Sequence, residues 1–365
     1  MRILITGSNG FVGKNLYYFL KSKKKYEIYE FNRKDNFKKL EKLIHLVDVI
    51  FHCAGENRSL KKKNFKISNI ELTKSIVSIL NLKKKKTLLI FTSTNLIKSN
   101  TQTDYSYSKF VAEKIIKKQL IKVHSYKILR MPNIFGKWAK PNFNSVVATF
   151  CYNISRDLPI TIIKNKKINF CYIDDLVFLL EKIINKQKKV QFKTYNCKIS
   201  TLAVKIKKIK KNRFHSLKEF SKSKFDKYLY ATYLSYIPLK DIIYKLKSHQ
   251  DSRGDFVELF KYPGNGQISY FSIGPRITRG GHYHNTKVEK FFITDGTVIF
   301  DFYNINTKKK FSIKVNSKDH VVLETIPGYV HSIRNIEKKI SKGIIWSNEV
   351  FDKKKPDTIN NLNNE

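Results

Sequence analysis

Cysteine, acidic residues and long apolar runs are all scarce in this sequence. Only four cysteines occur among the 365 residues, and none has CxxC spacing, so we expect free thiols in a reducing compartment rather than a disulfide framework. No stretch approaches the roughly 20 apolar residues of a membrane helix. The chain starts on a strand-like run, without the charged region, apolar core and cleavage site of a signal peptide. These absences predict a cytoplasmic protein with no membrane partner.

The shortage of acidic residues leaves a formal net charge of +43, from 72 basic and 29 acidic residues. A surplus of this size raises the hypothesis of a nucleic-acid-binding protein, which predicts steeply salt-dependent DNA binding. The lysines, however, form short clusters between apolar segments along the whole chain, such as Lys23–Lys25 and Lys207–Lys211. A solvated lysine surface explains this distribution better than one basic patch. We therefore expect no nucleic acid partner, although the positive field favours an anionic substrate.

Short apolar runs alternate with amphipathic, lysine-rich segments over about the first 135 residues. Strands that are apolar on both faces are typical of a parallel sheet covered by helices, with right-handed crossovers between strands. The pattern predicts an α/β fold with a Rossmann-type doubly wound parallel sheet, extended by a small substrate lobe with a helix over Asp174–Lys188. We assign residues 1–245 to this domain. Its expected strands are Arg2–Thr6, Glu27–Phe31, Val47–Cys53, Thr87–Phe91 and Lys127–Met131.

The pattern changes near residue 246. Strand-like runs separated by Gly, Asn, Asp and Pro replace the earlier alternation, and Asp295-Gly296 between two runs predicts a hairpin. We expect an all-β second domain, a sandwich or barrel, over residues 246–355, and a flexible polar tail over residues 356–365. The expected strands are Gln267–Ile273, Lys287–Thr294, Val298–Tyr303, Lys310–Val315 and Gly343–Ser347.

A glycine-rich segment, Thr6-Gly7-Ser8-Asn9-Gly10-Phe11-Val12-Gly13, directly follows the first expected strand and precedes a helix. Glycines there allow a tight turn and a close approach of backbone amides to a pyrophosphate at the helix N-terminus. A simple tight turn would also use glycines, but the position at the first strand–helix junction favours a dinucleotide site. The expected cofactor contacts in this segment are Gly7, Asn9, Gly10, Phe11, Val12 and Gly13.

The spacing Gly-x-x-Gly-x-x-Gly resembles the extended branch of the short-chain dehydrogenase/reductase superfamily. The resemblance implies a Tyr-x-x-x-Lys pair after the fourth strand, which Tyr105 and Lys109 supply, and a hydroxyl at the end of that strand. Thr94 fits this hydroxyl best by register, and Ser93 is second. Reduction of a ketone needs a proton for the new alkoxide, and a lysine one helical turn from a tyrosine favours tyrosinate. An amphipathic helix with a buried tyrosine is the alternative interpretation.

The residues after the second strand bear on the choice of cofactor. Sites that prefer NAD place an acid there to hold the ribose hydroxyls. Here the strand runs into Asn32-Arg33-Lys34, and a neutral residue followed by basic ones suits a 2′-phosphate, so we expect NADPH, held by Asn32 and Arg33. Two alternatives stay open: the cations are ordinary surface residues, or the nearby Asp35 serves NAD. Further cofactor contacts are expected from Asp48, Ala54, Gly55, Tyr105 and Lys109.

Four metal-ligand side chains cluster in the second domain. His282 and His284 lie two residues apart on an expected strand and so face the same way, Glu289 begins the next strand, and His331 can come from a neighbouring strand. Three imidazoles and one carboxylate suit Zn²⁺, or another borderline divalent ion, with room left for water or substrate. The alternative is a cluster without metal.

The spacing of these residues resembles the two motifs of the cupin barrel, including the closing His-x-x-x-Asn that ends at Asn335. One departure is Arg276, which stands where the family has a glycine, six residues before the first histidine, with Gly274 nearby. Some cupins lack a metal and serve only as dimer scaffolds. The resemblance therefore implies a barrel fold but not a bound metal. The expectation of a metal rests on the four ligand residues.

A reductase domain followed by a cupin is similar to the bifunctional capsule and O-antigen precursor enzymes of the CapF/WbjC type. The matching segments are residues 51–58, 130–138, 142–151, 172–175 and 281–291. The resemblance implies a homodimer acting on a UDP-linked 4-keto-6-deoxy-N-acetylhexosamine. The cupin inverts carbon 3, and the reductase then uses NADPH to give UDP-2-acetamido-2,6-dideoxy-L-talose, on the route to N-acetyl-L-fucosamine.

This chemistry is coherent, because a ketone at carbon 4 acidifies the proton on carbon 3 and a nearby metal stabilises the enolate. Inversion also needs an acid/base pair, for which Tyr283, Lys287 and Lys290 are candidates. The alternative is a monofunctional NAD(P)-dependent reductase or epimerase whose cupin is a dimerisation module. The expected substrate contacts in the reductase domain are Arg58, Asn133, Lys137, Asn142 and Asn144.

Overall fold

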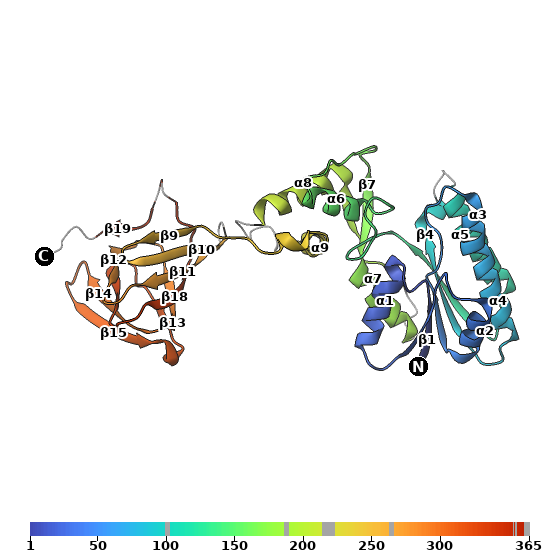
Figure 1. The fold of residues 1–365 in the computed structure, drawn as a ribbon, viewed down its shortest axis with the longest axis horizontal. Helices are drawn as coiled ribbons and strands as arrows, with labels where there is room; N and C mark the ends of the chain where they lie inside the picture. The colour runs from blue at the N-terminus through green and yellow to red at the C-terminus, as the bar shows by residue number, and fades with distance from the viewer. Residues whose placement is uncertain are drawn as a thin grey trace. The chain divides into compact units, whose positions relative to one another are not determined.

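The computed structural model of the chain describes residues 1–98, 103–185, 190–213, 223–262, 266–352, 354 and 356–360. The chain divides into two compact units (Figure 1): the first comprises Met1–Lys208 and Ser223–Leu239, and the second comprises Ile209–Lys222 and Lys240–Glu365. None of the described helices is both long and apolar enough to cross a membrane.

Five parallel strands form the main sheet of the first unit, in the order β2-β1-β3-β4-β5. The first strand lies inside the sheet, so the chain winds outward in both directions from it, and the predicted Rossmann-type doubly wound sheet is confirmed. The fourth strand continues three residues beyond its predicted end, through the hydroxyls that the sequence placed after it. The strands are β1 (Arg2–Thr6), β2 (Glu27–Phe31), β3 (Val49–His52), β4 (Leu88–Thr94) and β5 (Ser125–Met131).

Helices cover both faces of this sheet (Figure 1). α1 contacts α7 on one face, whereas α2, α4 and α5 contact one another on the other face. A continuous apolar core lies under the second group and includes the fully buried sheet residues Leu4, Ile50 and Leu89. The helices of this part are α1 (Phe11–Ser22), α2 (Phe37–Leu46), α3 (Lys62–Phe65), the π-helix η1 (Lys66–Glu71), α4 (Leu72–Leu82), the 3₁₀ turn η2 (Asn95–Lys98) and α5 (Asp104–Gln119).

A smaller lobe follows β5 in the first unit. Its three-stranded sheet has the order β6-β7-β8, and the ring of Phe135 packs against those of Phe170 and Phe225. The predicted helix over Asp174–Lys188 is α7, and its predicted end lies outside the described residues. The elements are β6 (Asn133–Phe135), α6 (Val146–Ser155), β7 (Lys167–Tyr172), α7 (Ile173–Ile184), β8 (Tyr195–Lys198), α8 (Ile199–Asn212), α9 (Lys224–Leu234) and η3 (Leu239–Asp241).

Two antiparallel sheets form the cupin-like barrel of the second unit, in the orders β16-β13-β18-β11-β10-β9 and β15-β14-β17-β12-β19. These two sheets confirm the predicted all-β domain. Its core contains the aromatic side chains of Phe271, Phe291 and Phe300. The elements are β9 (Ser248–Asp251), β10 (Gly254–Tyr262), β11 (Gly266–Ile273), β12 (Thr278–Tyr283), β13 (Glu289–Asp295), β14 (Thr297–Asn304), β15 (Lys310–Asn316), η4 (Ser317–Asp319), β16 (Val322–Glu324), β17 (Tyr329–Asn335), β18 (Ser341–Ser347) and β19 (Ile359–Asn360).

One sequence prediction about this unit is wrong. Asp295-Gly296 forms a turn, with φ +89° at Gly296, but the flanking strands β13 and β14 belong to different sheets, so the turn is not a hairpin. Within the predicted tail of residues 356–365, Ile359–Asn360 form β19, which runs antiparallel to β12. Residues 361–365 lie outside the described residues.

The turn that enters β12 forms despite the replacement of a glycine. The amide of Ile277 donates to the carbonyl of Gly274 at 3.2 Å, and Arg276 between them has φ +62°. Left-handed backbone costs an L-residue about 1–2 kcal/mol relative to glycine. The turn of the family pattern is therefore kept, with local strain at Arg276.

Candidate active sites

The glycine-rich loop lies between β1 and α1, at the carboxyl end of the parallel sheet. Gly7 has φ +71°, and a Cβ there would lie 2.7 Å from the Cα of Ala54, so only glycine fits. Gly10 precedes α1 without a side-chain cap, and the first turn of α1 has no acidic residue. The amides of this turn therefore remain available to an anion, as a pyrophosphate site requires.

Asn32 fixes this loop from the end of β2. Its Oδ1 accepts from the amide of Asn9 at 3.0 Å, and its Nδ2 donates to the hydroxyl of Ser8 at 2.8 Å. Asp35 accepts from the amide of Asn32 and from the Nζ of Lys39, which together hold the pKa of that carboxyl below its usual value despite partial burial. The acid that the sequence left open as an NAD ligand is thus already engaged within the chain.

Asp48 is not part of this site, and the prediction that it lies near the adenine is wrong. It immediately precedes β3, so it lies at the amino end of the parallel sheet, opposite the glycine-rich loop. There it accepts from the backbone amide of Arg2 at 2.9 Å and pairs with Lys85 at 2.6 Å. Ala54 and Gly55 follow the other end of β3, and the amide of Ala54 donates to the hydroxyl of Thr6 at 3.2 Å, beside the loop.

Tyr105 and Lys109 both lie near the start of α5, which begins with a capping box between Thr103 and Ser106. Burial raises the pKa of Tyr105, and a hydrogen bond with Thr94 only partly opposes this effect. The pKa of Tyr105 is therefore raised rather than lowered, contrary to the effect expected from Lys109. A protonated phenol is the form that can donate a proton to a reduced carbonyl oxygen.

The ammonium group of Lys109 is buried and donates to the carbonyl oxygen of Thr92 at 2.9 Å. Burial lowers the pKa of Lys109 to about 8, against the opposing effects of Cys53 and Glu113. The group is thus still largely charged at neutral pH and is fixed next to the end of β4.

Ser93, the second choice for the catalytic hydroxyl, is engaged elsewhere. Its Oγ donates to the Oε1 of Glu113 at 2.6 Å. The same buried carboxylate accepts two bonds from Arg130, at 2.9 and 2.6 Å. The geometry therefore favours Thr94, which faces Tyr105, as the hydroxyl of the site.

Asn69 is a residue that sequence reasoning missed. It lies fully inside the protein in the π-helix η1, where its side chain accepts from the amide of Glu56 at 2.8 Å and donates to the hydroxyl of Ser108 at 2.8 Å. It thereby joins the segment after Gly55 to α5. Single π-turns occur often at functional sites, but the sequence signal is only an asparagine inside a helical pattern.

The predicted substrate contacts are only partly brought together. Arg58 donates to the carbonyl oxygen of Phe143, which places it beside the predicted Asn142 and Asn144. Asn142 has φ +53°, and its amide and its Nδ2 donate to Thr149 and Asn153 of α6, so it ties the turn to that helix. Lys137 pairs with Asp174 at 2.6 Å, and Asn133 is exposed at the start of β6.

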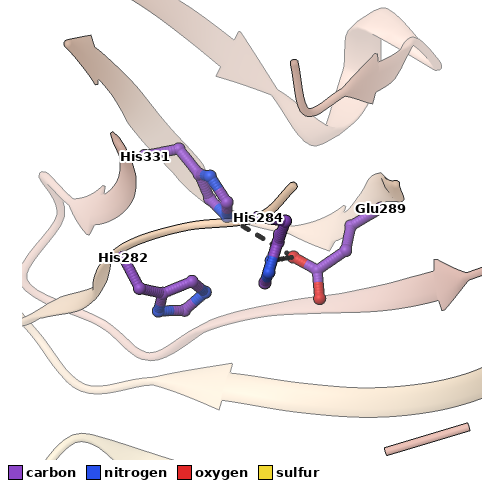
Figure 2. Close-up of side chains that lie close together, drawn as sticks. All are labelled: His282, His284, Glu289 and His331. Atoms are coloured by element: carbon purple, nitrogen blue, oxygen red, sulfur yellow. Dashed lines mark ion pairs between the residues drawn. The ribbon is translucent and has the colours of Figure 1, made fainter. Parts of the chain in front are cut away.

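The four predicted metal ligands converge in the second unit. Figure 2 shows His282, His284, Glu289 and His331 around one point, and their ligand atoms all lie within 4.8 Å of one another. They come from β12, the segment after it, β13 and β17. A bulge between Gly280 and His282 shifts the pairing of β12 with β17, which sets His282 opposite His331.

The chemistry of this cluster fits a divalent metal. The Nε2 atoms of His284 and His331 lie 3.3 and 3.4 Å from Glu289 Oε2, yet within the described residues these two buried nitrogens have no hydrogen-bond partner. Burial, together with His331, lowers the pKa of His282 to about 4. Burial of Glu289 disfavours its charge, but contacts with the imidazoles and Lys287 outweigh it and hold the pKa of Glu289 well below its usual range. A neutral imidazole, as at His282, and an ionised carboxylate, as at Glu289, are the forms that bind metal.

A cavity of 440 Å³ opens onto this cluster inside the second unit. Among the predicted acid/base candidates, Lys287 lines the cavity and lies 2.5 Å from Glu289, whereas Tyr283 does not line it. Lys290 is next to Glu289 on β13 and so faces the opposite side, where it pairs with Glu324 at 2.6 Å. The predictions of Tyr283 and Lys290 are therefore not supported by the geometry. The aromatic residues of the cavity are Phe256, Phe271, Phe291, Phe300 and Phe351.

Comparisons with known proteins agree with this division of the chain. Residues 3–197 match the NAD dependent epimerase/dehydratase family, and residues 249–359 match the polysaccharide biosynthesis C-terminal domain. A curated Pseudomonas aeruginosa protein, named UDP-2-acetamido-2,6-beta-L-arabino-hexul-4-ose reductase, is 38% identical over 98% of each chain. The crystal structure of the capsular polysaccharide assembling protein CapF from Staphylococcus aureus has 33% identity and a TM-score of 0.91 over 99% of each chain. The UDP-glucuronic acid 4-epimerase of Bacillus cereus, solved with NAD, matches 65% of this chain at 18% identity and a TM-score of 0.54, so it shares the fold.

Proposed function

Because the chain belongs to the NAD dependent epimerase/dehydratase family and to its two-domain CapF/WbjC type, we propose that it converts a UDP-linked 4-keto-6-deoxy-N-acetylhexosamine in two steps. The second unit epimerises carbon 3, and the first unit then reduces the ketone at carbon 4 with NADPH. The product is UDP-2-acetamido-2,6-dideoxy-L-talose, a precursor for capsule or O-antigen synthesis. The main support for this proposal is the presence of two candidate sites in one chain. The first unit holds the Tyr105–Thr94 pair, and the second unit holds the metal-ligand cluster.

In the reduction step, NADPH supplies the hydride for carbon 4. The hydroxyl of Thr94 orients the carbonyl oxygen, and the phenol of Tyr105 gives its proton to that oxygen. Its raised pKa keeps Tyr105 in the donor form until the negative charge develops. Lys109 lies one helical turn after Tyr105 and is fixed by the carbonyl of Thr92; we propose that its positive charge favours the tyrosinate that results, which then takes a proton from solvent.

In the epimerisation step, His282, His284, Glu289 and His331 would hold the metal, for which we propose Zn²⁺. A bound divalent ion polarises a ketone and stabilises an enolate. The chain itself supplies a cavity lined by both aromatic and polar side chains, and Lys287 is part of that lining. We propose Lys287 as one member of the acid/base pair that moves the proton on carbon 3.

Incubation of the protein with the UDP-4-keto sugar in D₂O, followed by NMR, tests this function. We expect deuterium at carbon 3 without NADPH, and a new alcohol at carbon 4 once NADPH is added. Reduction without any deuterium uptake would instead favour a reductase whose barrel is a dimerisation module. Absence of both reactions would contradict the proposal.

Arg33 offers a test of the cofactor choice. It is exposed and pairs with Glu56 at 2.9 Å, so a 2′-phosphate can compete for the guanidinium. Charge-assisted hydrogen bonds contribute about 1.5–3 kcal/mol, so Arg33→Ala should raise the KM for NADPH about 10- to 100-fold and leave the KM for NADH unchanged. Lys34→Ala is the control, because it removes the same charge from the next exposed position. Equal weakening of both cofactors by Arg33→Ala would contradict the assignment.

Three further proposals rest on the sequence. We propose that the protein acts as a homodimer in the cytoplasm, without a nucleic acid partner. We also propose that the reductase domain spans residues 1–245 and the cupin domain residues 246–355. Sedimentation of the purified chain, and expression of the two segments divided at residue 245, test the dimer and the boundary.

A further inference from the structure

Residues 356–360 cross the metal-ligand cluster from the C-terminal end of the chain. We call this segment the C-terminal strap. Its strand β19 pairs antiparallel with β12, so that Asn360 lies opposite His282 and Ile359 opposite Tyr283. Thr358 and Asn360 also line the cavity. The strap is thus part of the wall beside the ligands.

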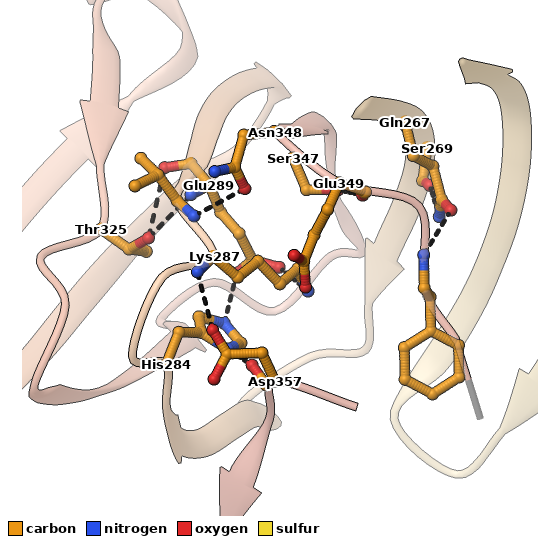
Figure 3. Close-up of polar contacts among 12 residues, drawn as sticks. Gln267, Ser269, His284, Lys287, Glu289, Thr325, Ser347, Asn348, Glu349 and Asp357 are labelled. Atoms are coloured by element: carbon orange, nitrogen blue, oxygen red, sulfur yellow. Dashed lines mark hydrogen bonds and ion pairs between the residues drawn. The ribbon is translucent and has the colours of Figure 1, made fainter. Parts of the chain in front are cut away.

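Asp357 of the strap fixes the turn between two ligands. Its carboxylate accepts hydrogen bonds from the backbone amides of Asn285, Thr286 and Lys287, at 3.0, 2.7 and 2.8 Å, and from the Thr286 hydroxyl at 3.0 Å. Figure 3 shows this carboxylate beside His284 and Lys287. Three successive amides that point at one carboxylate form an anion-binding concavity, here filled from a segment about 70 residues away in sequence. The backbone between His284 and Glu289 therefore depends on Asp357 for its conformation.

The backbone of Asp357 acts directly on a ligand. Its carbonyl oxygen is bonded to the Nδ1 of His284. Because a carbonyl oxygen only accepts, Nδ1 must carry a proton, so the neutral tautomer that this contact selects leaves the lone pair on Nε2, the nitrogen that faces Glu289. The Nδ1 of His331 also faces a carbonyl, that of Tyr329 at 3.3 Å, but this partner belongs to its own strand. His284 alone of these two imidazoles is oriented by a distant segment.

We propose that the C-terminal strap is a positioning element of the metal site, with Asp357 as the residue that sets the 285–287 turn and the tautomer of His284. This inference rests on the proposed metal site. A histidine ligand whose other nitrogen is held by a carbonyl or carboxylate is fixed in orientation and tautomer, and loss of such a partner lowers metal affinity about 10- to 100-fold.

The test compares metal binding by the full-length wild-type chain, Asp357→Ala, Asp357→Asn and the control Asp352→Ala. Asp352 is an exposed acid in the segment leading to the strap, and its carboxylate accepts from the amide of Lys354. The Kd for Zn²⁺ is measured by competition with a chelator, and the ligand geometry is read from the visible absorption of the Co²⁺-loaded protein.

Asp357→Ala keeps the backbone carbonyl that faces His284 but removes the carboxylate that anchors the strap to the 285–287 turn, so the carbonyl is no longer held against Nδ1. We expect this variant to raise the Kd for Zn²⁺ about 10- to 100-fold and to alter the Co²⁺ spectrum. Asp357→Asn, which keeps one acceptor oxygen, should give a smaller change, and Asp352→Ala none. Circular dichroism and thermal unfolding of each variant measure the folding of the barrel. Should Asp357→Ala not fold, the comparison of Asp357→Asn with the wild type decides.

A Kd within twofold of the wild-type value for both Asp357 variants, with unchanged Co²⁺ spectra, would overturn the inference, as would a wild-type chain that binds no metal. Failure of the proposed function looks different. If the wild-type chain binds Zn²⁺ tightly in a strap-dependent way but does not exchange the proton on carbon 3, the epimerase assignment fails and the positioning role stands.

Discussion

Replacing Tyr105 by phenylalanine is expected to lower kcat for reduction of the 4-ketone about 10³-fold. The substitution removes the proton donor that faces Thr94, while the glycine-rich loop and Asn32, which shape the expected nucleotide site, are untouched. General acid catalysis contributes about 10²- to 10⁴-fold, and the hydride and the positioned carbonyl remain. Stopped-flow measurement of NADPH oxidation at saturating substrate gives the rate, and fluorescence titration gives the Kd for NADPH, which should change less than threefold.

Tyr107→Phe is the matched control for this experiment. Tyr107 lies on the same helix, two residues further on, and its side chain is 52% exposed, so loss of its hydroxyl should leave kcat unchanged. Deuterium uptake at carbon 3 should persist in Tyr105→Phe, since the ligand cluster belongs to the other unit. If Tyr105→Phe kept a tenth of the wild-type rate, the phenol would not be the proton donor.

The reverse pattern is expected when the metal ligands are disturbed. Removing the metal with a chelator, or replacing His282 by alanine, should lower the rate of deuterium exchange at carbon 3 about 10³-fold or more, because a metal contributes several kcal/mol of charge stabilisation to an enolate-like transition state. Reduction of substrate already epimerised at carbon 3 should proceed at the wild-type rate. NMR follows the exchange, and NADPH absorbance follows the reduction.

His249→Ala serves as the control for the metal-site variant. His249 is an exposed residue of β9 and does not line the cavity, so its loss should change neither reaction. Re-addition of Zn²⁺ to the chelated wild-type protein should restore exchange, whereas His282→Ala should not recover. Were Tyr105→Phe and His282→Ala each to lose both activities while remaining folded, the assignment of one step to each unit would be wrong.

The parts of the two candidate sites whose placement in the fold agrees with the sequence predictions are those carried by local patterns. The glycine spacing after Thr6, and the pair Tyr105 and Lys109 one turn apart, need only one strand–helix junction and one helix for their placement. In both cases the geometry is set within about one element, where residue spacing determines direction. The metal-ligand cluster instead draws on β12, β13 and β17 from two sheets, and the sequence predicted it from its residue types and their resemblance to the cupin motifs.

The errors concern contacts that spacing does not determine. Asp48 precedes β3, whereas Ala54 follows it. The two residues therefore lie at opposite ends of the sheet, and the sequence prediction, which placed both beside the cofactor, is wrong for Asp48. Asp295-Gly296 has the composition of a hairpin turn, but composition does not say that the next strand joins another sheet. The polar residues around Asp357 look like a frayed end, because the amides that bind this carboxylate are about 70 residues away.

The buried network of Ser93, Glu113 and Arg130 has a consequence for how the first unit works. The carboxylate joins β4, β5 and α5, and both of its oxygens already accept charge-assisted or hydroxyl bonds. Sliding the helix along the sheet would break these bonds inside the protein, where an unmatched carboxylate is costly. The network therefore holds the end of β4, which carries Thr94, against the helix that carries Tyr105, so under the proposed function the proton donor is preorganised before a substrate binds.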